Sequence, residues 1–120
     1  MSRREVMVHV RRGDEFLVLH RVEAKGGYWH TVAARVEHDE DWPEAARREL
    51  REEAALDGEL RELGAFSYEP SMDGRAFAVD APAGWEPTLD WEHDDYRWCS
   101  RADAAALLEW PEPKEMLRAV

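Results

Sequence analysis

The sequence has only one cysteine, Cys99, so no disulfide can form within the chain and no zinc site with several thiolates can be built. It also lacks an apolar run near the ~20 residues that a membrane-spanning helix requires. Its first residues do not contain the uninterrupted apolar core of a signal peptide. These absences predict a cytoplasmic protein in a reducing compartment, with no membrane partner.

Basic charge is scarce beside acidic charge. Lys and Arg total 16 against 27 Asp and Glu, and the formal net charge at pH 7 is −11. Such a chain repels polyanions, so we expect no nucleic acid polymer as a partner. A small phosphorylated substrate is compatible with this charge if divalent cations bridge it to acidic side chains.

The chain has enough apolar sequence for one domain. Hydrophobic residues make up 44% of its 120 residues, and apolar segments are spread along the whole length. A core at this length can bury roughly two thirds of the surface that the unfolded chain exposes. We expect a single domain over residues 1–120, as a monomer or a homodimer.

Several segments predict strands because they are rich in β-branched and aromatic residues. Residues 5–12 and 15–21 form an expected hairpin, since Gly13 and Asp14 between them are typical turn residues. Further strands are expected over residues 30–37 (with a bend at 33–35), 59–69, 75–81 and 96–100, and terminal helices over 102–110 and 113–120.

A charged helix is expected over residues 41–55. Asp41 is the predicted N-cap, Glu44 closes a capping box, and Pro43 lies in the first turn, where its missing N–H is harmless. Gly58 follows as a typical stop signal. Together with the strands, this helix predicts an α/β (α+β) sandwich, a mixed sheet flanked by helices.

Three glutamates of this helix, Glu49, Glu52 and Glu53, occupy positions i, i+3 and i+4, so their carboxylates are expected to converge. Like charges at such spacings repel by about 0.2–0.5 kcal/mol per pair in an isolated helix. Neighbouring arginines such as Arg48 and Arg51 could neutralise them in a solvated, salt-bridged surface helix. The alternative is a hard divalent cation, for which carboxylate oxygens are the natural ligands.

The order of residues around the glutamates favours the cation. Ala34 is followed by five residues, Glu40, seven more residues, and then "RELREEAAL" over 48–56. This frame resembles the Nudix box, G-x5-E-x7-R-E-U-x-E-E-x-G-U, where U is a bulky aliphatic residue. The matching positions are Glu40, Arg48, Glu49, Leu50, Glu52, Glu53 and Leu56.

Both departures from the box replace a glycine, by Ala34 near its start and by Ala55 near its end. Asp39 also stands where many members of the family have glycine. A side chain at a position with positive φ strains the backbone by ~1 kcal/mol or more. We therefore expect strain in the loop that carries the Ala33 backbone carbonyl.

The resemblance extends beyond the box. "WEHDDYRWCSRADAAALL", residues 91–108, is similar to the small nucleoside-triphosphate pyrophosphohydrolases of the family, especially the branch acting on dihydroneopterin triphosphate and dATP. Glu92 in this stretch matches an acidic residue that binds metal or acts as the base in some members. The resemblance implies a Nudix-type sandwich with the loop–helix–loop of the box at Ala34–Leu56.

The implied function is hydrolysis of a diphosphate linkage in a (deoxy)nucleoside or pterin triphosphate, with release of pyrophosphate and a monophosphate. Mg²⁺ is the implied cofactor, and Mn²⁺ a substitute. The alternative is a catalytically impaired, Nudix-fold nucleotide-binding or regulatory protein, because Ala34 and Ala55 replace the box glycines.

The implied metal ligands are Glu49, Glu52, Glu53, Glu92 and the Ala33 carbonyl. The base is Glu49 or Glu92, and Glu40 and Arg48 hold the loop and helix together.

Other candidates rest on residue type alone. Two basic residues, Arg21 and Lys25, could contact phosphates but are expected to be solvated surface charges. Aromatic residues in strands usually pack in the core, and some stack on ligands. The stacking candidates are Tyr28, Trp29, Phe66, Tyr68 and Trp85, whereas Trp42, Trp98 and Trp110 are expected to pack.

Overall fold

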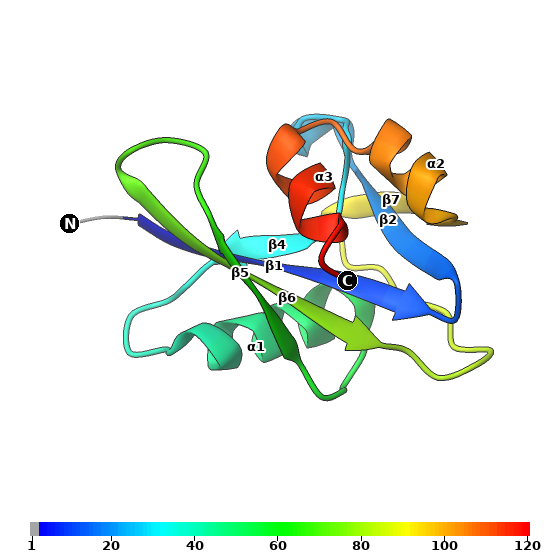
Figure 1. Ribbon diagram of the computed structural model, residues 1–120, viewed down its shortest axis with the longest axis horizontal. Helices are drawn as coiled ribbons and strands as arrows, with labels where there is room; N and C mark the ends of the chain where they lie inside the picture. Colours follow the sequence, from blue (N-terminus) through cyan, green and yellow to red (C-terminus); the bar gives the residue numbers. More distant parts are fainter. Residues whose placement is uncertain (1–2) are drawn as a thin grey trace.

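The computed structural model of the protein describes residues 3–120 and shows one mixed sheet between two layers of helices (Figure 1). Helix α1 (Trp42–Ala54) lies on one face, and α2 (Arg101–Leu107) and α3 (Pro111–Leu117) lie on the other. The predicted sandwich is therefore confirmed. Within the described residues, no helix has both the length and the hydropathy needed to cross a bilayer.

The sheet has seven strands, ordered β3-β2-β1-β6-β5, with β4 paired to β1 and β7 paired to β2. Only the β1–β6 pair is parallel, and the other pairs are antiparallel. A short 3-10 helix, η1 (Glu23–Lys25), follows β2. The strands are β1 (Arg3–Arg12), β2 (Glu15–Arg21), β3 (Trp29–His30), β4 (Val32–Arg35), β5 (Arg61–Phe66), β6 (Met72–Asp80) and β7 (His93–Cys99).

Strand β1 lies at the centre of the sheet and contributes to the core on both faces, because successive side chains point to opposite sides of a strand. Val6 and Val8 pack in the core cluster that includes Leu50 of α1. Met7 belongs to a second cluster, which Met116 of α3 covers. The same alternation places Arg3 and Glu5 on the α3 side of the sheet, where a large cavity opens.

The predicted hairpin and the predicted capping box are both confirmed. Arg12 pairs with Glu15 across the turn. At the start of α1, the Glu44 N–H donates to the Asp41 carboxylate over 2.8 Å, and the Glu44 carboxylate accepts from the Asp41 N–H over 3.1 Å. Both features depend on residues close together in sequence, which explains why they could be predicted.

The single strand predicted over residues 30–37 is wrong, because the chain changes partner at Thr31. β3 pairs with β2, whereas β4 pairs with β1. The Thr31 hydroxyl donates to the Val8 carbonyl over 2.6 Å at this switch. The predicted bend at residues 33–35 is absent, since they form a regular part of β4 and place Ala33 opposite Met7.

Several predicted boundaries shift because long-range pairing extends the strands. β6 begins at Met72 rather than at residue 75, since its parallel partner β1 supplies hydrogen bonds from Arg3 onward. β7 begins at His93 rather than at residue 96, through pairing with β2. Helix α2 begins one residue earlier than predicted, because the Ser100 side chain accepts a hydrogen bond from the Asp103 N–H at 3.1 Å.

Backbone strain lies at Ala55 and not at Ala34. Ala55 ends α1 in the left-handed conformation, with φ 60° and ψ 42°. Among residues 3–120, the other non-glycine residue with positive φ is Asp39. Ala34 lies in β4, so the strain expected there is wrong and the Ala33 carbonyl sits on an ordinary strand.

These conformations predict that substitution by glycine changes the free energy of unfolding in opposite directions at Ala55 and Ala34. Ala55→Gly should raise the free energy of unfolding by about 1 kcal/mol, because it relieves the left-handed strain. Ala34→Gly should lower it by about 0.5–1 kcal/mol, because glycine in a strand loses more backbone entropy on folding. Urea unfolding of both variants checks the pair, and a stabilising effect of Ala34→Gly would contradict the assignment.

Candidate active site

A buried pair of carboxylates on α1 forms the centre of the candidate site. Glu49 and Glu53 lie one turn apart on the face of the helix that packs against the sheet, and their exposed fractions are 8% and 1%. Glu52 points to solvent with 57% of its side chain exposed, because one residue step turns the helix by about 100°. The structure thus brings together two of the three predicted carboxylates.

Glu53 is the most unusual side chain of the site. Within residues 3–120, neither of its carboxylate oxygens has a hydrogen-bond partner. Burial raises the pKa of Glu53 well above its ordinary value, and the nearby carboxylates of Glu49 and Asp90 raise it further, while the polar backbone of Ala33 opposes part of the shift. A buried acid without partners is costly, so the position suits a bound cation.

Arg48 connects the loop before α1 to this carboxylate pair. It donates two hydrogen bonds to Glu40, from Nε over 2.7 Å and from Nη2 over 2.9 Å, and its Nη1 donates to Glu49. The hydrogen bonds from Arg48 lower the pKa of Glu40, and those to Glu40 and Glu49 raise the pKa of Arg48. Such two-pronged, charge-assisted bonds fix geometry, so Arg48 holds Glu49 in one orientation.

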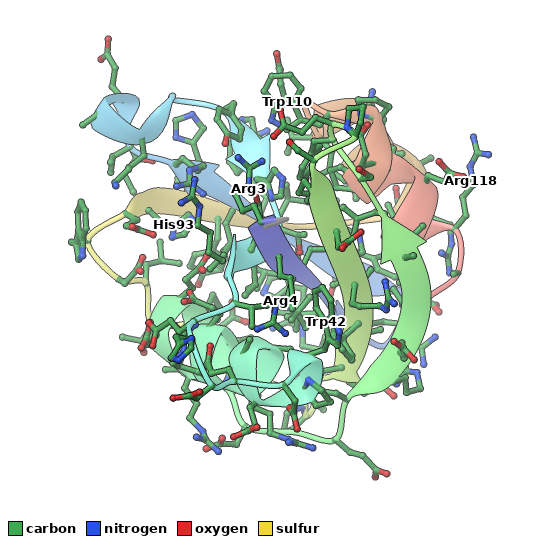
Figure 2. All side chains as sticks on the ribbon, turned by 90° about the vertical axis from the view of Figure 1, so that its left-hand side faces the viewer. Arg3, Arg4, Trp42, His93, Trp110 and Arg118 are labelled. Atoms are coloured by element: carbon green, nitrogen blue, oxygen red, sulfur yellow. The ribbon has the colours of Figure 1, made fainter. Side chains whose placement is uncertain are left out.

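Two residues near Glu53, His93 and Asp90, were not predicted from the sequence as part of the site. His93, at the start of β7, is fully buried, and its Nδ1–H donates to the Asp90 carboxylate over 2.8 Å (Figure 2). Its other ring nitrogen, Nε2, lies 3.6 Å from a Glu53 oxygen. Metal-ligating histidines commonly donate their other ring N–H to a carboxylate in this way, and among the described residues His93 Nε2 has no hydrogen-bond partner. The sequence signal for His93 was its position, three residues after Asp90 and directly after Glu92.

A cavity of about 810 Å³ opens beside the Ala33 and Ala34 backbone. One part of its wall is basic, with Arg21, Lys25 and Arg35. The first two were expected to be solvated surface charges. Lys25 is exposed and Arg21 partly buried, and both line the cavity. This concentration of cations in a protein of net charge −11 marks the cavity as suited to an anionic ligand.

The aromatic end of the cavity is formed by Tyr28, Tyr68, Trp110 and Glu112. Tyr28 and Trp110 meet edge to face, with ring centroids 5.7 Å apart. Trp110, which was expected to pack, is 43% exposed and lies at the top of Figure 2, with Arg3 between it and α1. The other stacking candidates lie away from the cavity: Trp29 against His20, Phe66 in the core and Trp85 against Trp98.

The predicted metal ligands do not form a finished coordination shell. In the described part of the chain, no group of three or more His, Cys, Asp or Glu side chains is arranged to hold a metal ion. Glu52 points to solvent, and a Glu92 oxygen lies 3.7 Å from the Lys25 ammonium. The residues present nevertheless fit a divalent cation at one point, where the unpartnered oxygens of Glu53 adjoin Glu49 and the Ala33 backbone.

Comparison with known proteins agrees with this geometry. The chain matches the family model described as NUDIX domain over residues 1–120. It therefore belongs to the Nudix hydrolase family, whose members generally use a divalent metal.

Solved structures share the fold along the whole chain. An Ap4A hydrolase from C. elegans superposes with a TM-score of 0.83 at 23% identity, covering 97% of this chain and 93% of that one. For the E. coli dihydroneopterin triphosphate pyrophosphohydrolase the TM-score is 0.76 at 24% identity, with 96% and 92% covered. A NUDIX hydrolase from Listeria monocytogenes gives 0.77 at 30% identity, with 99% and 90% covered.

A curated relative, an octanoyltransferase from Myxococcus xanthus, is 30% identical over 117 residues. The match covers 89% of this chain but 33% of the relative. The chain therefore spans about a third of that protein's length, and the relative's activity is not carried over to it.

Proposed function

We propose that the protein hydrolyses the diphosphate linkage of a (deoxy)nucleoside or pterin triphosphate in a Mg²⁺-dependent reaction, releasing pyrophosphate and a monophosphate. The observation that carries the proposal is Glu53, a buried carboxyl without a hydrogen-bond partner among the described residues. It lies next to a second carboxylate and to the backbone of Ala33, a residue that also lines the cavity with the basic wall. We further propose that the protein acts in the cytoplasm on small substrates, as a monomer or homodimer.

Glu49, Glu53 and the Ala33 carbonyl would hold the cation, and Glu52 completes the set once its exposed side chain turns inward. A bound divalent cation neutralises phosphate oxygens and lowers the pKa of coordinated water. Arg48 holds Glu49 in place through a hydrogen bond, which keeps that carboxylate oriented before substrate arrives. His93 Nε2 lies 3.6 Å from Glu53 and forms no hydrogen bond with it.

The two candidate bases differ in their surroundings. Glu49 is buried, its carboxylate is engaged by Arg48, and it does not line the cavity. Glu92 lines the cavity and is partly exposed, near Lys25. We therefore assign Glu92 as the residue that takes the proton from the attacking water, while Arg21, Lys25 and Arg35 bind the phosphates.

The test is release of phosphate with and without Mg²⁺, in the presence of added pyrophosphatase for nucleoside triphosphates and dihydroneopterin triphosphate. For ADP-ribose, whose cleavage gives two phosphate monoesters, alkaline phosphatase is added instead. We expect turnover of a triphosphate that stops when EDTA is added, because polyphosphate repels the nucleophile unless a cation screens it. Folded protein that binds nucleotide and Mg²⁺ but turns over none of these substrates would favour the alternative, a Nudix-fold binding or regulatory protein.

A further inference from the structure

The aromatic end of the cavity carries hydrogen-bond acceptors. Glu112, half-buried in the first turn of α3, lines the cavity and has no hydrogen-bond or ion-pair partner among residues 3–120. Glu5, on the same side of the sheet, also lines it and forms an ion pair with Arg3. Burial raises the pKa of Tyr68 above its ordinary value, and the nearby carboxylates of Glu5 and Glu112 raise it further.

Tyr68 adds a third acceptor because its proton is already committed. The His30 Nδ1–H donates to the Thr31 carbonyl over 3.0 Å, so Nε2 carries a lone pair toward the Tyr68 hydroxyl, 3.2 Å away. Burial lowers the pKa of His30 to about 4, so the ring is neutral near pH 7 and this tautomer is kept. Tyr68 therefore donates to His30 and offers its oxygen lone pair to the cavity.

The same part of the cavity has the shape and surface that a planar ring requires. Tyr28 and Trp110 form an edge-to-face corner, and the Arg21 guanidinium lies 5.7 Å from the Tyr28 ring centroid. Aromatic rings and guanidinium planes stack on flat heterocycles. Arg21 of the basic wall lies beside the Tyr28 ring, so the phosphates of a ligand whose ring occupies the aromatic end would lie near this wall.

We propose that the aromatic end selects a 2-amino-4-oxo-pyrimidine ring, the ring shared by guanine and pterins, over adenine, with the free carboxylate of Glu112 as the main selecting group. Such a ring presents an N–H and an adjacent amino group on one edge, which match the two oxygens of one carboxylate. Adenine presents a ring-nitrogen lone pair there, which a carboxylate repels. This inference rests on the proposed function, since it refines the substrate of the same site.

The test is isothermal titration with the α,β-methylene analogues of GTP, ITP and ATP in the presence of Mg²⁺. These analogues carry the same phosphates and resist cleavage between the α and β phosphorus atoms, so binding is measured without turnover. We expect the GTP analogue to bind about 10-fold to 100-fold more tightly than the other two, because ITP lacks the amino group and ATP also lacks the ring N–H.

Three variants attribute the preference to one residue. Glu112→Gln should reduce it to about 3-fold or less, because the amide keeps only one acceptor oxygen. Glu115→Gln is the matched control: it makes the same charge change on an exposed residue of α3 outside the cavity, and should keep the full preference. Glu112→Asp keeps a carboxylate and should retain part of the preference, which separates loss of the acceptor from damage to the helix.

Equal binding of the ATP and GTP analogues, or an unchanged preference in Glu112→Gln, would overturn the inference. Its failure is distinguishable from failure of the proposed function. Turnover of triphosphates without a ring preference would support the proposed hydrolase activity and contradict the proposed selectivity. Guanine-selective binding without turnover of any triphosphate would support the selectivity and contradict the hydrolase activity.

Discussion

Glu53→Gln is expected to lower kcat for the best triphosphate substrate by about a thousand-fold, which corresponds to a loss of about 4 kcal/mol of transition-state stabilisation. Glutamine has nearly the same shape but cannot supply the negative charge that holds a cation. The same substitution should leave the melting temperature of the metal-free protein unchanged or raise it, since it replaces a buried acid that has no hydrogen-bond partner.

Steady-state kinetics and thermal unfolding in EDTA check the two halves of this prediction. The matched control is Glu44→Gln, which alters a carboxylate of the same helix that is exposed and outside the cavity. The control should keep kcat and most of its stability, because a glutamine side chain can still accept the capping-box hydrogen bond from the Asp41 N–H. A marked fall in melting temperature for Glu53→Gln would instead assign that residue a structural role.

Acid should destabilise the protein through its buried histidines. Burial lowers the pKa of His9 and that of His30 to about 4, from an ordinary value of 6.5. Between these values the unfolded chain binds a proton that the folded protein does not, so the free energy of unfolding falls as the pH falls. Each histidine contributes about 1.4 kcal/mol per pH unit, or about 3 kcal/mol over the interval. Glu53 acts in the opposite direction, because its pKa is raised.

Comparison of variants isolates the histidine contribution. His9 donates from Nε2 to the Pro113 carbonyl over 2.9 Å, a bond that a glutamine amide can replace. Urea unfolding of His9→Gln between pH 6.5 and 4 should show a pH dependence smaller than that of the unaltered protein by about 1.4 kcal/mol per unit. His38→Gln, at a side chain that is 94% exposed, should show no such change. Equal slopes for all three proteins would contradict the prediction.

The success of the sequence-based predictions depended on how local each feature is. The capping box of α1 and the hairpin turn at Gly13 involve neighbours in the chain, and both appear as predicted. The direction of Glu52 could also have been predicted. Leu50 and the small residues Ala46 and Ala54 mark the packed face of the helix, which includes Glu49 and Glu53 and leaves Glu52 outside.

Most of the candidate site could not be predicted, because its residues come together only through long-range pairing. His93 meets Glu53 only after β7 has joined β2. Glu112 and Tyr68 reach the cavity from α3 and from the segment after β5, and no local pattern connects them. The glycine pattern of the family indicated positive φ at Ala55 and Asp39, where the structure has it, and wrongly at Ala34, which lies in β4.

The parallel pair at the centre of the sheet has a consequence for the folding rate. Residues 3–11 pair with residues 72–80, so β1 cannot complete its hydrogen bonds until the intervening chain is in place. Closing so long a loop costs entropy before any contact compensates for it, and such topologies fold slowly for their size. On the ribosome, β1 must therefore wait, with one edge unpaired, until β6 has been synthesised.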